Sequence, residues 1–114
     1  MLQHNDDLVF RALADPTRRA MLERLDGGPL AVTALAEPFD VTLTAITQHV
    51  RTLERAGLIT SEKSGRERIC SVDRDGLVRA EQWISTRRQM WERRLDRLDR
   101  HLDERHPRPK GTRR

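Results

Sequence analysis

Residues that break helices divide this chain into short segments, and their spacing limits what the chain can fold into. Asp15-Pro16 ends one helical pattern and opens the next, because Asp can cap a helix and Pro suits its first turn. Further breaks follow at Asp26-Gly27-Gly28-Pro29 and at Pro38. Gly57 stands where a left-handed residue would close a helix, and Gly65 where a hairpin would turn. The breaks therefore predict several short helices and one hairpin, followed by a longer uninterrupted stretch.

The hydrophobic pattern assigns a structure to each segment. The predicted elements are helices over residues 5–14, 16–25 and 32–36, a helix between its N-cap Thr42 and Gly57, strands over 58–63 and 68–72 with a tip at 64–67, and a last helix over 75–104. The order α-α-α-α-β-β-α is that of a winged helix-turn-helix, mainly α with a small β-hairpin. We expect this single domain to occupy residues 1–105.

The net charge of +4 is unevenly distributed along the sequence. Residues 106–114 (HPRPKGTRR) hold four of the 22 Lys and Arg residues and no acidic residue, and we expect them to form a basic disordered tail. The other 18 basic residues balance the 18 Asp and Glu residues of residues 1–105. Attraction of the folded part to nucleic acid must therefore come from how its charges are arranged, and not from their sum.

A single cysteine, Cys70, limits the class of protein. One cysteine forms no internal disulfide, which fits a cytoplasmic protein. The first ten residues carry acids where a secretory signal needs bases, and no segment approaches the roughly 20 apolar residues that cross a membrane. No nucleophile beside a base and no glycine-rich phosphate loop is visible. We expect a cytoplasmic protein with no membrane segment, no cofactor and no enzymatic activity.

The segment from Thr42 to Gly57 places two chemistries on opposite sides of one helix. Ile46, Val50 and Leu53 lie on the side expected to face the core. The other side carries hydroxyls, an amide and arginines, where a merely solvated face would more often carry Glu and Lys. Gln can bridge adenine N6 and N7 and Arg can bridge guanine O6 and N7, so this side suits the major groove of DNA. The residues expected to contact DNA are Thr42, Thr44, Ala45, Thr47, Gln48, His49 and Arg51.

Basic residues also surround the tip of the predicted hairpin. Lys63, Arg66 and Arg68 could enter the minor groove or clamp phosphates. Glu62 and Glu67 offset part of this charge, so the hairpin is only weakly basic. A polar helix between a short helix and a basic hairpin predicts a sequence-specific DNA-binding transcriptional regulator.

The last helix carries an apolar stripe that suits pairing with a second copy of the chain. Its residues recur at seven-residue intervals with intervening leucines, which is the spacing of a helix–helix contact. They are Leu77, Ile84, Trp91, Leu95, Leu98 and Leu102. Arg88 interrupts the stripe, so a long regular coiled coil is not expected.

Three motifs occur in a fixed order along the chain. They are LADPTRR at residues 13–19, LTAITQHVRTL at residues 43–53, and AGLI at residues 56–59 followed by Gly65-Arg66. Together they resemble the ArsR/SmtB family of bacterial transcriptional repressors, and the resemblance covers about residues 5–104. The run from residue 83 to residue 96 resembles a branch of the family that lacks the recognised metal sites.

The resemblance implies both a partner and a contact surface. The family fold is a homodimer joined by its first and last helices, which adds Leu8 to the expected dimer contacts. Carried over by position, the operator face comprises Thr44, Ala45, Thr47, Gln48, His49 and Arg51, with Arg66 on the wing. We therefore expect a homodimeric repressor that binds double-stranded DNA at an imperfect palindromic operator. Release would require a signal that biases the dimer away from the DNA-compatible spacing, for which an unidentified effector is a candidate.

Metal sensing and thiol sensing remain as variants of this hypothesis. The segment at 32–36, where some members carry a Cys-x-Cys pair, reads Val-Thr-Ala-Leu-Ala and cannot bind a soft metal. His101 and His106 are five residues apart, a poor spacing for one helix face, so we predict no metal site. Cys70 is expected to be a small packing residue, since a lone thiol has no resolving partner in its own chain.

Two further alternatives stay open. His49 could contact a base, or it could bond to a neighbouring backbone carbonyl. From a different functional class, a winged helix can serve as a protein-interaction adaptor that touches no nucleic acid. Its binding face would show exposed apolar or aromatic anchors, whereas the face predicted here carries Ala45, Thr47 and a neighbouring Arg-bearing hairpin.

Overall fold

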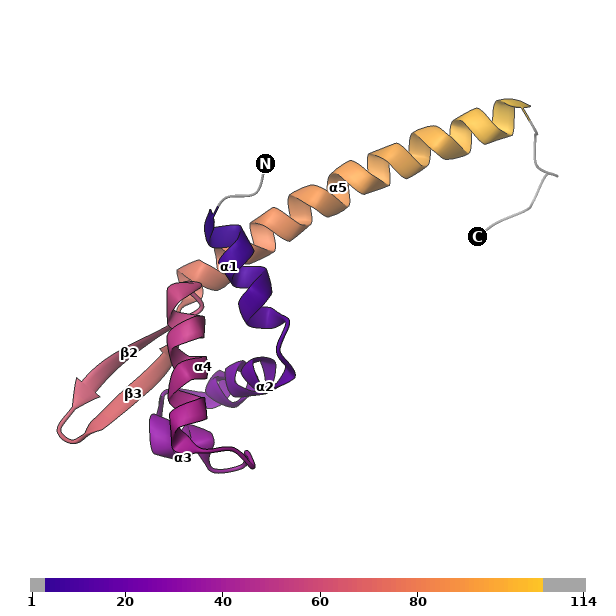
Figure 1. Ribbon diagram of the computed structural model, residues 1–114. Helices are drawn as coiled ribbons and strands as arrows, with labels where there is room; N and C mark the ends of the chain where they lie inside the picture. The colour runs from indigo at the N-terminus through magenta and orange to yellow at the C-terminus, as the bar shows by residue number, and fades with distance from the viewer. Residues whose placement is uncertain (1–3, 106–114) are drawn as a thin grey trace. The chain divides into compact units, whose positions relative to one another are not determined.

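The computed structural model describes residues 4–105, and the predicted tail at 106–114 lies outside the described residues. The elements are α1 His4–Leu13, α2 Pro16–Arg24, the 3₁₀ turn η1 Leu25–Gly27, β1 Leu30–Ala31, α3 Val32–Ala36, α4 Leu43–Arg55, β2 Ile59–Ser64, β3 Glu67–Val72 and α5 Arg74–Arg105 (Figure 1). The fold is mainly helical with a small antiparallel sheet, which confirms the predicted winged helix-turn-helix. Within residues 4–105 no helix is long and apolar enough to span a membrane.

Contacts divide the chain into two units, residues 1–80 and 81–114. The hydrophobic core belongs to the first unit and takes side chains from its helices and from the sheet. Met21, Leu35, Ile46, Leu53, Leu58, Ile59 and Cys70 are its largest fully buried side chains. No charged or polar residue is buried among the described residues, so this small core is held by apolar packing.

Asp15 starts α2 in the way that the sequence predicts. Its carboxylate accepts hydrogen bonds from the backbone N–H of Thr17 at 2.8 Å and of Arg18 at 3.1 Å, and Pro16 occupies the first turn. Desolvation raises the pKa of the Asp15 carboxyl, but these backbone bonds and the charge of Arg18 outweigh it and hold the pKa below its usual value. The cap therefore acts as an ionised carboxylate at neutral pH.

Both ends of α4 match the sequence prediction. The Thr42 hydroxyl accepts from the Ala45 N–H at 3.1 Å and caps the first turn. Gly57 has φ +77°, its N–H bonds to the Glu54 carbonyl, and the Leu58 N–H bonds to the Leu53 carbonyl at 3.0 Å. This is a Schellman closure, in which a left-handed glycine lets two orphan carbonyls find donors. Because Leu58 belongs to the closure, β2 begins at Ile59 and not at Leu58 as predicted.

The sheet has three strands in the order β1-β3-β2, one more than predicted. In the extra strand, β1, Leu30 pairs with Cys70 of β3, and the chain then continues directly into α3. The predicted tip at 64–67 is also wrong by one residue at each end, because Ser64 and Glu67 still pair. The turn therefore contains two residues, Gly65 and Arg66. Gly65 has φ +63°, and a positive φ at the first turn residue is what this type of two-residue hairpin requires. Beside α4, the hairpin forms the wing (Figure 1).

α5 begins against the closure of α4. The Asp73 carboxylate accepts from the backbone N–H of Asp75 at 3.1 Å and of Gly76 at 3.3 Å, so Asp73 caps the helix. Gly76 packs so closely against the backbone of Gly57 that a Cβ at position 76 would overlap the Gly57 carbonyl. This first turn of α5 is thus fixed to the end of α4 by contact between two glycine backbones.

Candidate nucleic-acid interface

α4 buries one side and exposes the other. Ile46, Val50 and Leu53 are at most 2 % exposed, which confirms the predicted core face. Thr44 and Gln48, like Arg51, are exposed on the opposite side, and Ala45 and Thr47 lie half-buried on its flanks. The helix thus presents the predicted polar surface to solvent, while its contact with DNA stays a prediction.

The threonines on α4 differ in what their hydroxyls can offer. Thr42 already accepts from the Ala45 N–H, and Thr47 donates its hydroxyl proton to the Leu43 carbonyl at 2.9 Å. A Thr47 hydroxyl that has given its proton to the helix can accept but cannot donate. Thr47 is therefore better suited to apolar contact with a thymine methyl than to a phosphate oxygen, which needs a donor.

A shallow hollow of about 230 Å³ joins the polar residues in the second half of α4. It is lined by Gln48, Arg51, Thr52 and Arg55. The Thr52 hydroxyl donates to the Gln48 carbonyl at 3.1 Å, so the amide and the two guanidinium groups supply the free donors. This donor set matches acceptors on purine edges and phosphates.

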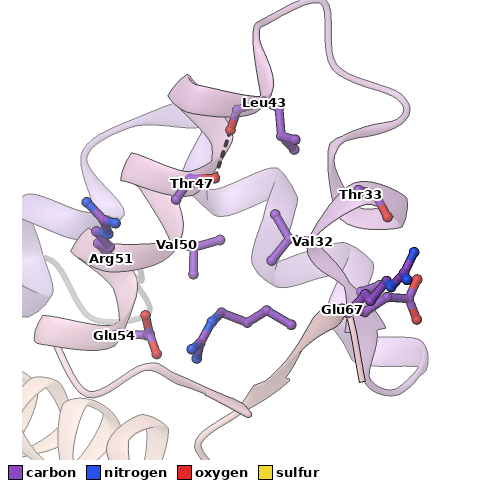
Figure 2. A pocket seen from close by; sticks show the side chains of 11 residues that line it. Val32, Thr33, Leu43, Thr47, Val50, Arg51, Glu54 and Glu67 are labelled. Carbon is purple, nitrogen blue, oxygen red and sulfur yellow. Dashed lines mark hydrogen bonds between the residues drawn. The ribbon is translucent and has the colours of Figure 1, made fainter. Parts of the chain in front are cut away.

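A second, larger cleft of about 430 Å³ lies between α4, the start of α3 and the turn end of the wing (Figure 2). Val32 and Val50 give it apolar walls, and Arg51 lines it from α4. Arg66 and Arg68 line the same cleft from the wing. The structure therefore brings together, on one concave surface, the helix and the hairpin that the sequence predicts to contact DNA.

The wing is linked to α4 by a relay that the sequence pattern did not reveal. Arg68 donates to the Ser61 hydroxyl at 2.9 Å, and Ser61 donates to the Glu54 carboxylate at 2.6 Å. Lys63 and Arg66, like Arg68, are exposed. Arg68 is thus held next to the wing turn and is linked through Ser61 to an acidic residue of α4, whereas Arg66 stands in the turn itself.

His49 is half-buried and turns toward the junction between α1 and α2. Its Nδ1 lies 3.3 Å from the Arg18 guanidinium, so the partner found is a side chain and not the neighbouring backbone carbonyl considered above. Arg18 also donates to the Ala12 carbonyl at 2.7 Å and to the Arg11 carbonyl at 2.8 Å. The motif at residues 13–19 contained Arg18, but no local pattern could pair it with a residue 31 positions later.

The apolar stripe of α5 is exposed in this single chain. The exposed fractions are 40 % for Leu77, 49 % for Ile84, 59 % for Trp91, 53 % for Leu95, 50 % for Leu98 and 42 % for Leu102. Leu8 on α1 is half-buried and packs against the core. The guanidinium of Arg94 lies over the Trp91 ring, 5.6 Å from its centroid. An exposed stripe of this size is a feature of surfaces that pair with a partner.

The side chains considered as metal ligands do not gather. Among the described residues no three His, Cys, Asp or Glu side chains lie close enough together to hold a metal ion. His101 is exposed on α5, whereas His106 lies outside the described residues.

Cys70 is fully buried in β3, directly opposite Ser61 in β2. Burial raises the pKa of the Cys70 thiol, and the nearby Glu54 carboxylate adds to this increase, while Arg68 partly opposes it. Because the thiolate is the reactive form, both burial and the raised pKa suppress reaction with oxidants. The environment is that of a packing residue.

We expect native Cys70 to react with iodoacetamide at pH 8 at least about 100-fold more slowly than in the unfolded chain, because the reagent must await opening of the sheet. The measurement is the time course of alkylation by mass spectrometry, with and without urea. Ser64→Cys provides an exposed thiol on the same hairpin as the control. Equal rates at the two cysteines would contradict a packing role for Cys70.

Comparison with known proteins places the matched region over the helix-turn-helix. A sequence model described as a helix-turn-helix domain matches residues 13–62. The HTH-type transcriptional regulator Rv2034 of Mycobacterium tuberculosis is 44 % identical over 72 residues, which cover 63 % of this chain and 67 % of that protein. The transcriptional repressor SdpR of Bacillus subtilis is 36 % identical over 58 residues, which cover 51 % of this chain and 64 % of the repressor.

Solved structures extend the match to most of the fold. The crystal structure of an ArsR family transcriptional regulator matches with a TM-score of 0.74 at 40 % identity, over 78 % of this chain and 98 % of that one. An ArsR-like transcriptional regulator from Rhodococcus sp. RHA1 matches with a TM-score of 0.74 at 29 % identity, over 84 % of this chain and 91 % of that one. This chain therefore reproduces nearly the whole length of both solved regulators.

Proposed function

Since the chain belongs to the ArsR family of winged helix-turn-helix transcriptional regulators, we propose that it is a cytoplasmic, homodimeric repressor that binds an imperfect palindromic operator. The observation that carries the proposal is the concave surface on which α4 and the wing together present Arg51, Arg66 and Arg68. Repression follows when the bound dimer occupies a promoter.

α4 is the helix that enters the major groove. Gln48 and Arg51 lie exposed in its middle turns and present the donors that read purine edges. Thr44 stands nearer the start of the helix, where free backbone N–H groups and a hydroxyl suit a phosphate. Sequence discrimination therefore depends chiefly on Gln48 and Arg51.

The wing supplies contacts that do not depend on sequence. Arg66 in the turn and Lys63 on β2 are exposed and suit phosphates or the minor groove. Arg68 is already bonded to Ser61, which links the wing to Glu54 of α4. Arg66 is therefore the wing residue expected to contribute most to affinity.

Pairing of two copies through the stripe on α5, together with α1 and its Leu8, gives the regulator its symmetry. Covering six exposed apolar side chains is the favourable term that drives the association. A two-fold axis then sets the two copies of α4 about 34 Å apart, one turn of DNA, which matches an operator made of two related half-sites.

The experiment is fluorescence anisotropy with DNA from upstream of the protein's own gene, titrated across a salt series. Neutralising about six to ten phosphates gives a slope of log affinity against log salt of roughly −5 to −9. Scrambled DNA of equal length should bind at least about 1,000-fold more weakly. A flat salt response, or equal affinity for scrambled DNA, would overturn the repressor proposal and favour a protein-interaction adaptor, which a stoichiometric protein partner in a pull-down would identify.

A further inference from the structure

Arg18 touches three helices at once, and the DNA-reading surface described above does not use it. It sits in the first turn of α2, its Nε donates to the Ala12 carbonyl and one terminal nitrogen donates to the Arg11 carbonyl, both at the end of α1. The other terminal nitrogen reaches His49 Nδ1 on α4 at 3.3 Å. A planar guanidinium with donors on three sides is the side chain that can make these contacts simultaneously.

The contact with Arg18 determines which ring nitrogen of His49 carries the proton. Arginine can donate but cannot accept, so His49 Nδ1 must carry a lone pair. With Nδ1 as the acceptor, the ring proton sits on Nε2, which becomes a hydrogen-bond donor. His49 is therefore held as the tautomer whose free donor is the Nε2–H.

Arg19 provides a natural comparison within the same motif. It also caps the end of α1, donating to the Leu13 carbonyl at 2.6 Å. Both arginines thus satisfy carbonyls that α1 leaves without an internal donor. The contact with His49 is what distinguishes Arg18 from Arg19 among the bonds that these two side chains make.

We propose that Arg18 is a positioning residue for operator recognition: it joins the end of α1 to His49 and presents the His49 Nε2–H to an acceptor on the DNA. This proposal rests on the proposed function and deepens it, because it assigns a role to a residue outside the reading helix. Since α1 belongs to the proposed dimer contact, Arg18 also ties the reading helix to the helix through which the two copies meet.

The first test compares Arg18→Ala with Arg19→Ala, which remove the same charge and a similar cap. Both should lower the melting temperature, Arg18→Ala by more, because Arg18 makes three hydrogen bonds and Arg19 one. Arg18→Ala should lower the ratio of operator to scrambled-DNA affinity about tenfold, the size expected for one lost hydrogen bond, while Arg19→Ala leaves this ratio unchanged. Equal effects of the two variants on the ratio would reduce Arg18 to a helix cap and overturn the proposal.

The second test asks whether Arg18 changes the ratio of operator to scrambled-DNA affinity by way of His49. His49→Ala should lower the ratio as Arg18→Ala does, and the double variant should lose no more than either single one, because both remove the same interaction. Additive losses would overturn the proposal.

A third measurement needs no DNA and separates this proposal from the proposed function. Nitrogen NMR of the His49 imidazole in the free protein should show protonated Nε2 and bare Nδ1 in the parent and in Arg19→Ala. In Arg18→Ala and Arg18→Lys the two tautomers should mix, because neither replacement keeps the fork that reaches Nδ1. If the His49 tautomer were unchanged in Arg18→Ala, the proposed role of Arg18 would be overturned even if operator binding is specific. If the parent shows the predicted tautomer but binds no operator specifically, the failure lies with the proposed function.

Discussion

Gly76→Ala is expected to destabilise the domain by about 3 kcal/mol or more, the upper range for overpacking, because the added Cβ would overlap the Gly57 carbonyl. The overlapping atoms belong to the Gly57 backbone, which cannot move aside by changing rotamer. Gly57 is also the residue with positive φ that closes α4. Relieving the overlap would pull α5 away from α4 or open the Schellman turn. For a domain of this size the loss corresponds to a fall of roughly 10 °C or more in melting temperature.

Gly27→Ala is the matched control for this substitution. A Cβ at Gly27 meets no atom within 4 Å, so the change should alter stability by no more than about 0.5 kcal/mol. Thermal unfolding followed by circular dichroism measures both variants. A Gly76→Ala protein that melts within about 2 °C of the parent would show that the two glycines are not in close contact.

Gln48→Ala is expected to reduce discrimination between the operator and its single-base variants by about 1–3 kcal/mol at one base pair, while leaving the fold intact. The physical reason is that Gln48 is exposed on α4 and its amide offers a paired donor and acceptor, which alanine lacks. Anisotropy titrations against a panel of single-base operator variants measure the effect. Discrimination should be lost at one position of each half-site and kept at the others.

Two comparisons make the Gln48 result interpretable. Arg66→Ala should weaken binding to all sequences similarly and make the salt slope about one unit shallower, because Arg66 is expected to contact phosphate. Gln82→Ala removes an exposed glutamine from α5 and should change neither quantity. If Gln48→Ala and Gln82→Ala bind the whole panel alike, α4 does not read bases through Gln48.

The parts of the fold that depend on residues close together in the sequence were predictable. The spacing of Ile46, Val50 and Leu53 predicted the buried face of α4, and Thr42 and Gly57 predicted its ends. Each of these depends on interactions within one helix and its caps, so the information lies within about 20 residues of sequence.

The features that sequence missed depend on individual side-chain or strand contacts that no periodic pattern encodes. β1 is formed by the pairing of Leu30 with Cys70, which lies far along the chain. Its two residues are too few to show a strand period in the sequence. The relay from Arg68 through Ser61 to Glu54 depends on how the wing folds back onto α4. Of the predicted site residues, the surroundings of Thr47 and His49 changed most, because hydrogen bonds to Leu43 and Arg18 determine which donors remain available.

From strand β1 we expect the wing and the helix-turn-helix to unfold as one cooperative unit. It leads directly into α3 and forms the outer strand beside β3, so the backbone that begins the helix-turn-helix is hydrogen-bonded to the hairpin. Opening β3 would free the start of α3 and remove support from α4 at the same time. On heating, the amide protons of Ala31, Ile69 and Val50 should therefore exchange with solvent together, and operator binding should disappear in one step without a stage at which α4 reads DNA and the wing has detached.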